Sequence, residues 1–187
     1  EQSFGVRSLG AVFPVGWQAT KDWIEKVARL TGQETRGKAI LAEEEAELAR
    51  QTALFQKQTA GRTAAIVTGR SPRWYDPAET AATLLRLGIR ISALILLNNL
   101  PPEDKEHLAA SFHRASNAPV LDGADGGSDM DDADLLLVSN EIYSTKTKQL
   151  FLPMVPLAGT AGEIAMMRAI AHLVCRYGTK GGIAYVE

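Results

Sequence analysis

The residues best equipped for chemistry lie in one loop, Gly69-Arg70-Ser71-Pro72-Arg73-Trp74-Tyr75-Asp76. The loop follows a short apolar run and precedes a helix start, where free N–H groups and guanidinium groups attract anions. Its candidate binding residues are Gly69, Arg70, Arg73 and Trp74. The pattern leaves two interpretations open, a binding or subunit-contact site and an ordinary solvated loop.

Neither phosphate-binding fingerprint occurs in this loop. The sequence contains no G-x-G-x-x-G after a strand and no G-x-x-x-x-G-K-[ST]. Because those glycines let the backbone approach a phosphate closely, their absence disfavours a nicotinamide enzyme and a P-loop nucleotide hydrolase.

A second candidate site lies at the start of the last helix. Gly159, Thr160 and Gly162 follow the last expected sheet strand, so the backbone there is able to approach a ligand or another chain. The favoured interpretation is a tight turn in which Thr160 is the N-cap and Glu163 completes a capping box. Ser139 and Asn140, after another strand, form a further candidate pair or only a cap.

No catalytic residue and no metal site are predicted. The carboxylates of residues 122–134 lack the spacing of an EF-hand, so a polar loop is favoured over a calcium site. His172 and Cys175 lie three apart on one helix, which favours a packed histidine and a buried, inert thiol.

Composition narrows the class of protein. Among 187 residues, 45% are hydrophobic and the net charge is −2, values that indicate an ordinary globular protein and give no sign of a nucleic-acid or membrane partner. A single cysteine excludes an internal disulfide framework and fits the reducing cytoplasm. No apolar run is long enough to span a bilayer.

These sites require a framework in which apolar strands alternate with helices. The periodicity predicts helices at Ala19–Leu30, Gly37–Thr59, Pro77–Gly88, Pro101–Phe112, Glu141–Lys148 and Thr160–Tyr177, with strands at Thr63–Thr68, Ile89–Leu97, Pro119–Leu121, Asp134–Ser139 and Pro153–Leu157. The tail Ile183–Val186 is either an edge strand or disordered.

Such alternation favours a mainly parallel sheet with right-handed crossovers, and we expect a Rossmann-like, three-layer α/β/α sandwich. Residues 1–60 are expected to form an N-terminal connection and two helices. They pack on a Rossmann-like domain of residues 61–187, and the whole forms one unit. The last helix is apolar almost all round, so it is expected to be central or covered by a partner.

Several segments together resemble one family. PVGWQATKDWIEKVARLTG (Pro14–Gly32) resembles the P-[IV]-G-x-x-x-T-[DK]-x-[FW]-[LI] segment of nitrogenase component 1-type oxidoreductases. That group holds the nitrogenase molybdenum-iron protein subunits, their cofactor-scaffold relatives and dark-operative protochlorophyllide reductase. AGRTAAIVTG (60–69), DADLLLVSN (132–140) and PMVPLAGTAGEIAMMRAIAHLV (153–174) are similar to successive segments of the same family.

The chain departs from the family pattern in two places. Asn140-Glu141-Ile142-Tyr143 stands where the family has Asn-Ser-[HY]-Gly, and the shorter Leu157-Ala158-Gly159-Thr160 replaces Phe-Pro-x-x-Asp-Arg. Cys175 matches none of the family's cluster ligands, so no ligand is carried over to this chain.

The resemblance implies that this chain is the last of three Rossmann-like domains in a longer oxidoreductase. The whole protein would pair with a homologous component 1 subunit and receive low-potential electrons from an ATP-dependent iron–sulfur reductase. An iron–sulfur cluster is expected in the full-length protein and no cofactor in this chain, which is expected to be inactive alone. The alternative is a stand-alone scaffold module, or one binding a small anion or nucleotide, without redox activity.

Overall fold

The chain forms a Rossmann-like α/β fold in a computed structural model that describes residues 14–73, 75–123, 127–143, 145, 147–155, 157–176 and 183–186. The helices are α1 Gly16–Thr31, α2 Glu34–Thr59, α3 Pro77–Arg86, α4 Pro102–Phe112, α5 Gly127–Asp132 and α6 Gly159–Cys175. The strands are β1 Thr63–Thr68, β2 Arg90–Leu96, β3 Val120–Asp122, β4 Leu135–Val138, β5 Lys148–Phe151 and β6 Ile183–Tyr185.

The six strands form one sheet in the order β3-β2-β1-β4-β5-β6, and every neighbouring pair is parallel. This is the doubly wound order in which the direction of winding reverses between β1 and β4, the place where such sheets bind ligands. Both central strands are buried along their whole length, as expected for apolar runs without alternation. The predicted fold class is confirmed, and Ile183–Tyr185 forms the edge strand β6.

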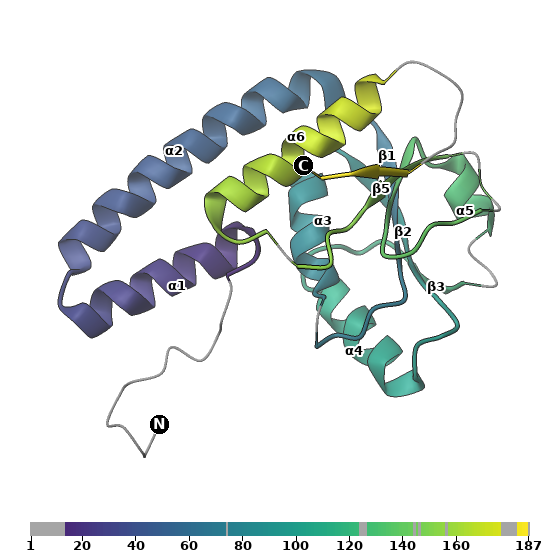
Figure 1. The fold of residues 1–187 in the computed structure, drawn as a ribbon, viewed down its shortest axis with the longest axis horizontal. Coiled ribbons are helices and arrows are strands. Elements are labelled where there is room, and N and C mark those ends of the chain that lie inside the picture. Colours follow the sequence, from purple (N-terminus) through teal and green to yellow (C-terminus); the bar gives the residue numbers. More distant parts are fainter. Residues whose placement is uncertain are drawn as a thin grey trace.

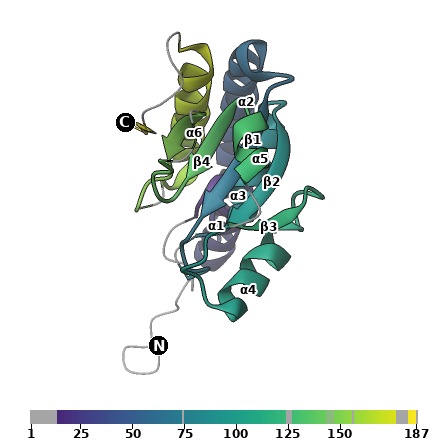
Figure 2. The same cartoon turned by 90° about the vertical axis from the view of Figure 1, so that its right-hand side faces the viewer.

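The two faces of the sheet are covered unequally. On one face, side chains of α2, α3, α4 and α6, such as Leu48, Leu84, Phe112 and Ile170, build the larger core. On the other face, Met130 of α5 packs against a smaller cluster that includes Val67 and Leu136. Figure 2 shows α5 on one side of the sheet, with α2 and α6 on the other.

Helices α1 and α2 form a hairpin that projects beyond the sheet (Figure 1). Helix α1 packs on α2, α6 and α3 rather than on the strands. It begins at Gly16 with Val15 as N-cap, earlier than predicted, and the Thr20 hydroxyl, inside the helix, donates to the Gly16 carbonyl at 2.6 Å. Gly32 ends α1 with φ at +67°, a left-handed conformation that favours glycine.

The predicted elements of residues 141–157 are wrong. The described part of Glu141–Lys148 holds no helix, and the next strand is β5 at Lys148–Phe151 rather than Pro153–Leu157. Residues 141–148 have no apolar helical face, whereas Gln149 and Leu150 are both buried. The Gln149 side chain forms two hydrogen bonds with the backbone of the preceding loop. It accepts from the Ile142 N–H and donates to the Ile142 carbonyl, as a neighbouring strand would.

The described part of the Asp-rich segment 122–134 contains helix α5, where a polar loop was predicted. Met130 anchors this helix from inside, and its carbonyl accepts from the Thr147 hydroxyl at 2.8 Å. Asp134 marks the start of β4, where its carboxylate accepts from the Thr63 N–H at 2.9 Å. The described residues hold no group of three ligands suited to a metal, and Asp125 lies outside them.

Candidate functional site

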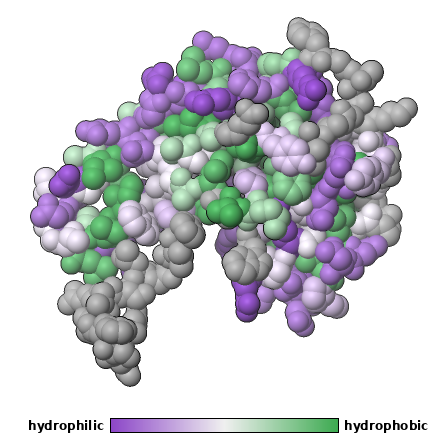
Figure 3. Space-filling view, in the orientation of Figure 1, coloured by the Kyte–Doolittle hydropathy of each residue, from purple (hydrophilic) through white to green (hydrophobic). Residues whose placement is uncertain are grey.

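A cleft of about 650 Å³ opens at the carboxyl ends of β1 and β5, between the start of α1 and the start of α6. Its floor and walls are mainly apolar, and its polar groups come from the loop after β1 and from α3 and α6. Apolar side chains gather near the centre of the face shown in Figure 3, beside a hollow. The lining residues used below are Val15, Gly16, Arg70, Arg73, Tyr75, Asp76, Glu79, Thr83, Leu152, Val155, Leu157, Gly162, Glu163 and Met166.

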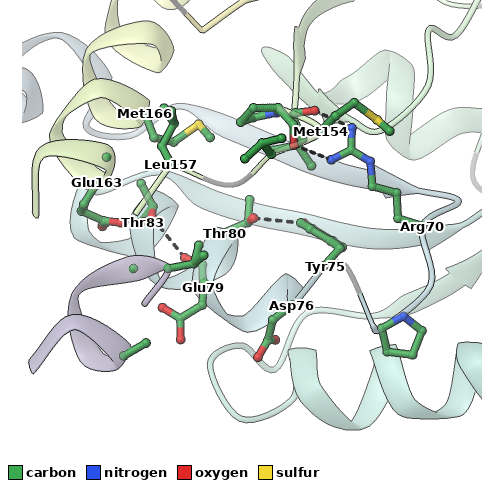
Figure 4. Close-up of a pocket in the computed structure, with 18 of the residues that line it drawn as sticks. Arg70, Tyr75, Asp76, Glu79, Thr80, Thr83, Met154, Leu157, Glu163 and Met166 are labelled. Atoms are coloured by element: carbon green, nitrogen blue, oxygen red, sulfur yellow. Dashed lines mark hydrogen bonds between the residues drawn. The ribbon is translucent and has the colours of Figure 1, made fainter. Parts of the chain in front are cut away.

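Arg70 lies at one end of this cleft, and its guanidinium group is already bonded. It donates to the Pro153 carbonyl at 2.7 Å and to the Leu152 carbonyl, and it lies 5.3 Å from the centre of the Phe151 ring. Burial lowers the pKa of Arg70. The side chain therefore ties the loop after β1 to the segment after β5, as Figure 4 shows.

A short hydrogen-bond chain lies at the switch point of the sheet and joins Gly69, Ser139 and Asn140. The Gly69 N–H donates to the Ser139 hydroxyl at 2.8 Å, and that hydroxyl donates to the Asn140 side-chain oxygen at 2.7 Å. A Cβ at Gly69 would lie 2.5 Å from an oxygen of Asn99. The structure brings these three candidate residues together at the strand ends, but they do not line the cleft.

The turn before α6 is built for close packing. Gly159 has φ at +73°, and its N–H donates to the Pro14 carbonyl at 2.9 Å. A Cβ at Gly162 would lie 2.5 Å from the Leu157 carbonyl oxygen. Gly162 lines the cleft, whereas Gly159 and Thr160 do not.

The predicted capping box at α6 is wrong. The N-cap is Ala158, without a side-chain cap, and the buried Thr160 hydroxyl has no hydrogen-bond partner among the residues that the structure describes. Glu163 turns instead toward α3, where it accepts from the Thr83 hydroxyl at 3.0 Å and lies 3.6 Å from Arg86. Burial raises the pKa of Glu163, and the contacts with Thr83 and Arg86 oppose that shift.

Glu79 is the residue that sequence reasoning missed. Glu79 lies three residues after Asp76, which is the spacing of a capping box, and Asp76 accepts from the Ala78 N–H at 2.9 Å. The Glu79 carboxyl lies instead against Gly16, in the space that a side chain at position 16 would need. Burial, followed by the charges of Asp76 and Glu163, raises the pKa of Glu79 to about 7. The only sequence signal was an acid in the first turn of a helix at a strand end.

The remaining residues of the loop after β1 differ in their positions and contacts. Arg73 lines the cleft and is exposed, and Trp74 lies outside the described residues. Tyr75 packs against the core, donates to the Thr80 hydroxyl at 3.0 Å and has its pKa raised by burial. The loop is thus a wall of the cleft rather than a freely solvated segment.

His172 and Cys175 do not form a site. Both are exposed, so the predicted packed histidine and buried thiol are wrong. The Cys175 thiol lies 3.4 Å from the Gln58 side-chain oxygen, on the helix end away from the cleft.

The described helices include none long and apolar enough to cross a membrane.

The fold and the cleft define an α/β protein with a ligand-sized opening at its strand ends, and comparison with known proteins gives its family. The sequence profile described as Nitrogenase component 1 type Oxidoreductase matches residues 1–172, and the chain belongs to that family. No match was found among curated protein sequences.

Solved structures agree on the fold. A chain described as Nitrogenase Cp1 at pH 5 is similar with a TM-score of 0.63 and 14% identity, over 87% of this chain and 41% of that chain. A chain described as Nitrogenase Cp1 at pH 6.5 is similar with a TM-score of 0.57 and 16% identity, over 86% of this chain and 38% of that one. This chain therefore spans about two fifths of the length of these solved chains.

The residues present do not fit an iron–sulfur cluster. Such clusters are held mainly by four cysteine thiolates, and this chain has one cysteine, on the exposed end of α6. No step of a reaction is assigned to a cluster on this chain.

Proposed function

We propose that this chain is the C-terminal Rossmann-like domain of a nitrogenase-like oxidoreductase and that it is not catalytic alone. The observation that carries the proposal is the family match over residues 1–172, in a chain that spans about two fifths of the solved nitrogenase chains. The single cysteine supports the same division of labour, with the clusters held elsewhere in the full protein.

In that protein the domain would provide a rigid wall. We propose that residues 1–60 and 61–187 act as one unit whose cleft, between Arg73 and Gly162, faces another domain, a cofactor or a partner subunit. The whole protein would pass low-potential electrons through iron–sulfur clusters to its substrate in the cytoplasm. Its partners would be a homologous component 1 subunit and an ATP-dependent iron–sulfur reductase.

The alternative function, a stand-alone module for a small anion or nucleotide, has less support. It depends on Arg70 and Arg73 as anchors for the anion. The Arg70 guanidinium is engaged by two backbone carbonyls, so an anion would have to compete with bonds that hold the loop. Arg73 alone remains exposed to solvent.

The test is an iron determination on the protein encoded by the complete gene, purified without oxygen. We expect several iron atoms per protein, and we expect the Cys175→Ser variant to keep all of them. An iron-free complete protein would overturn the proposal, as would loss of the iron in the Cys175→Ser variant.

A further inference from the structure

We propose that the cleft binds a ligand with an ammonium or guanidinium group on an apolar body, and that the Glu79 carboxylate receives the cation. This inference does not depend on the chain's place in a larger oxidoreductase. It is carried by the shape of the cleft, by the bonding state of its acids and by the charges around Glu79.

The cleft has the size and lining of a small-ligand site. Its volume of about 650 Å³ lies within the range of roughly 300–1,000 Å³ that such sites occupy. Val155, Leu157 and Met166 supply apolar surface around it, and Val155 is 72% exposed. An apolar body placed here would remove this surface from water, which stabilises the complex.

Glu79 differs from the other two acids that line the cleft. Asp76 already accepts from the Ala78 N–H and from Arg114, and Glu163 accepts from Thr83. Among the described residues, no hydrogen bond or ion pair engages the Glu79 carboxyl. A half-buried carboxyl without a partner costs free energy, and a cation supplied by a ligand would offset that cost.

The charges that face Glu79 favour a cation over an anion. Asp22 of α1, Asp76 before α3 and Glu163 of α6 all raise its pKa, and Arg114, after α4, opposes them. Arg86, on the same helix as Glu79, lies 3.6 Å from Glu163 and pairs with that carboxylate instead. A bound cation would favour the ionised form of Glu79, which burial and the neighbouring acids disfavour in the free chain.

The chemistry of the lining also excludes a simple alternative. A divalent metal needs several oxygen or nitrogen ligands around one point, and the described part of the chain holds no such group of three. A cation with its own apolar body matches both the single free acid and the apolar walls.

The test uses three probes that share one apolar body: 2-phenylethylamine, 2-phenylethanol and 3-phenylpropionate. The four methionines offer methyl groups for NMR titration of the whole chain. Met154 and Met166 line the cleft, Met167 is buried in the main core and Met130 lies under the opposite face. We expect the amine to shift the first two signals, to leave Met130 unchanged, and to bind more tightly than the alcohol and the acid.

The dependence on pH identifies Glu79. Because the cation binds the ionised carboxyl, affinity should rise about tenfold between pH 6 and pH 8 for a group that titrates near 7. Glu79→Gln should abolish this rise and lower the affinity at pH 8 about tenfold. The control Glu103→Gln removes an exposed acid of α4 that does not line the cleft, and it should behave like the parent.

A second comparison distinguishes two possible sources of the cation, a free small molecule and a side chain of a polypeptide. Free 2-phenylethylamine represents a small amine, and a capped peptide with one lysine between leucines represents a side chain of a polypeptide. Tighter binding of either one supports the site and names its source. Equal binding of the three phenyl probes, or an unchanged pH dependence in Glu79→Gln with a native thermal unfolding curve, would overturn it.

Discussion

The two ends of the cleft treat a charged side chain in opposite ways. At one end the Arg70 guanidinium is bonded to the Leu152 and Pro153 carbonyls and rests over Phe151. At the other end the Glu79 carboxyl lies against Gly16 with no bonded partner in the described part of the chain. The first charge stabilises the fold, and the second is kept at a cost in free energy.

This difference indicates that Arg70 has a structural role, whereas Glu79 is available to a ligand. Guanidinium groups next to a strand end attract attention in a sequence because they suit anions. Here the bonded arginine ties the loop after β1 to the segment after β5, while the acid without a bonded partner in the described residues is Glu79, in the first turn of α3. A charge without a partner, rather than a charge in a promising loop, marks the candidate binding residue.

The largest expected effect comes from Arg70→Ala. It leaves two backbone carbonyls without their donor, so we expect the free energy of unfolding to fall by about 2–3 kcal/mol. Urea unfolding measures the loss. The control Arg73→Ala removes an exposed guanidinium for which the described residues offer no partner, and it should change stability by less than about 0.5 kcal/mol. Equal losses in both variants would contradict a structural role for Arg70.

An intermediate effect is expected from Gly16→Ala. Gly16 has φ at +78°, and an added Cβ would collide with the Glu79 carboxyl, so we expect a loss of about 1–2 kcal/mol. In a Glu79→Ala background the collision disappears and only the backbone strain remains. A double-mutant cycle should therefore give a coupling of at least about 0.5 kcal/mol. Strict additivity would show that the two residues do not meet.

The smallest effect is the pH dependence of stability carried by Glu79. Its pKa is about 7 in the folded chain and 4.5 in the reference state, so the folded chain holds the proton more tightly between these values. Stability should therefore fall as pH rises from 5 to 8. After allowance for solvent screening, Glu79 contributes about 1 kcal/mol to this fall.

Urea midpoints of the parent and Glu79→Gln at pH 5 and pH 8 measure this contribution. The variant should lose less stability than the parent over this range, and Glu163, whose pKa is also raised, should retain part of the slope. An identical slope in both proteins would show that Glu79 is not a buried, unpaired acid.

Much of the framework follows from local sequence. The run Thr63–Thr68 predicts a strand buried on both faces, and Asp76-Pro77 predicts the start of α3, because both depend on residues within one turn or one strand. The parallel order of the sheet follows from the repeated alternation of strands and helices. In these features the local sequence preference agrees with the overall fold, which makes them predictable.

The free acid was not predictable, because its environment comes from distant parts of the chain. Glu79 is defined by Gly16 at the start of α1 and by Glu163 on α6, and neither lies near it in sequence. The β5 strand was misplaced for a related reason. Gln149 is polar and yet buried, since it bonds to the Ile142 backbone, a contact that no local pattern reveals.

A contact between the start of α1 and the start of α6 also constrains the order of folding. Val15 forms an antiparallel bridge with Ala158, and the Gly159 N–H donates to the Pro14 carbonyl. These bonds close most of the chain into a loop, so they are entropically costly to form before β1, β2 and β4 have assembled. Helix α1 should therefore dock late in folding, and its amide hydrogens should exchange with solvent through openings that leave the central strands protected.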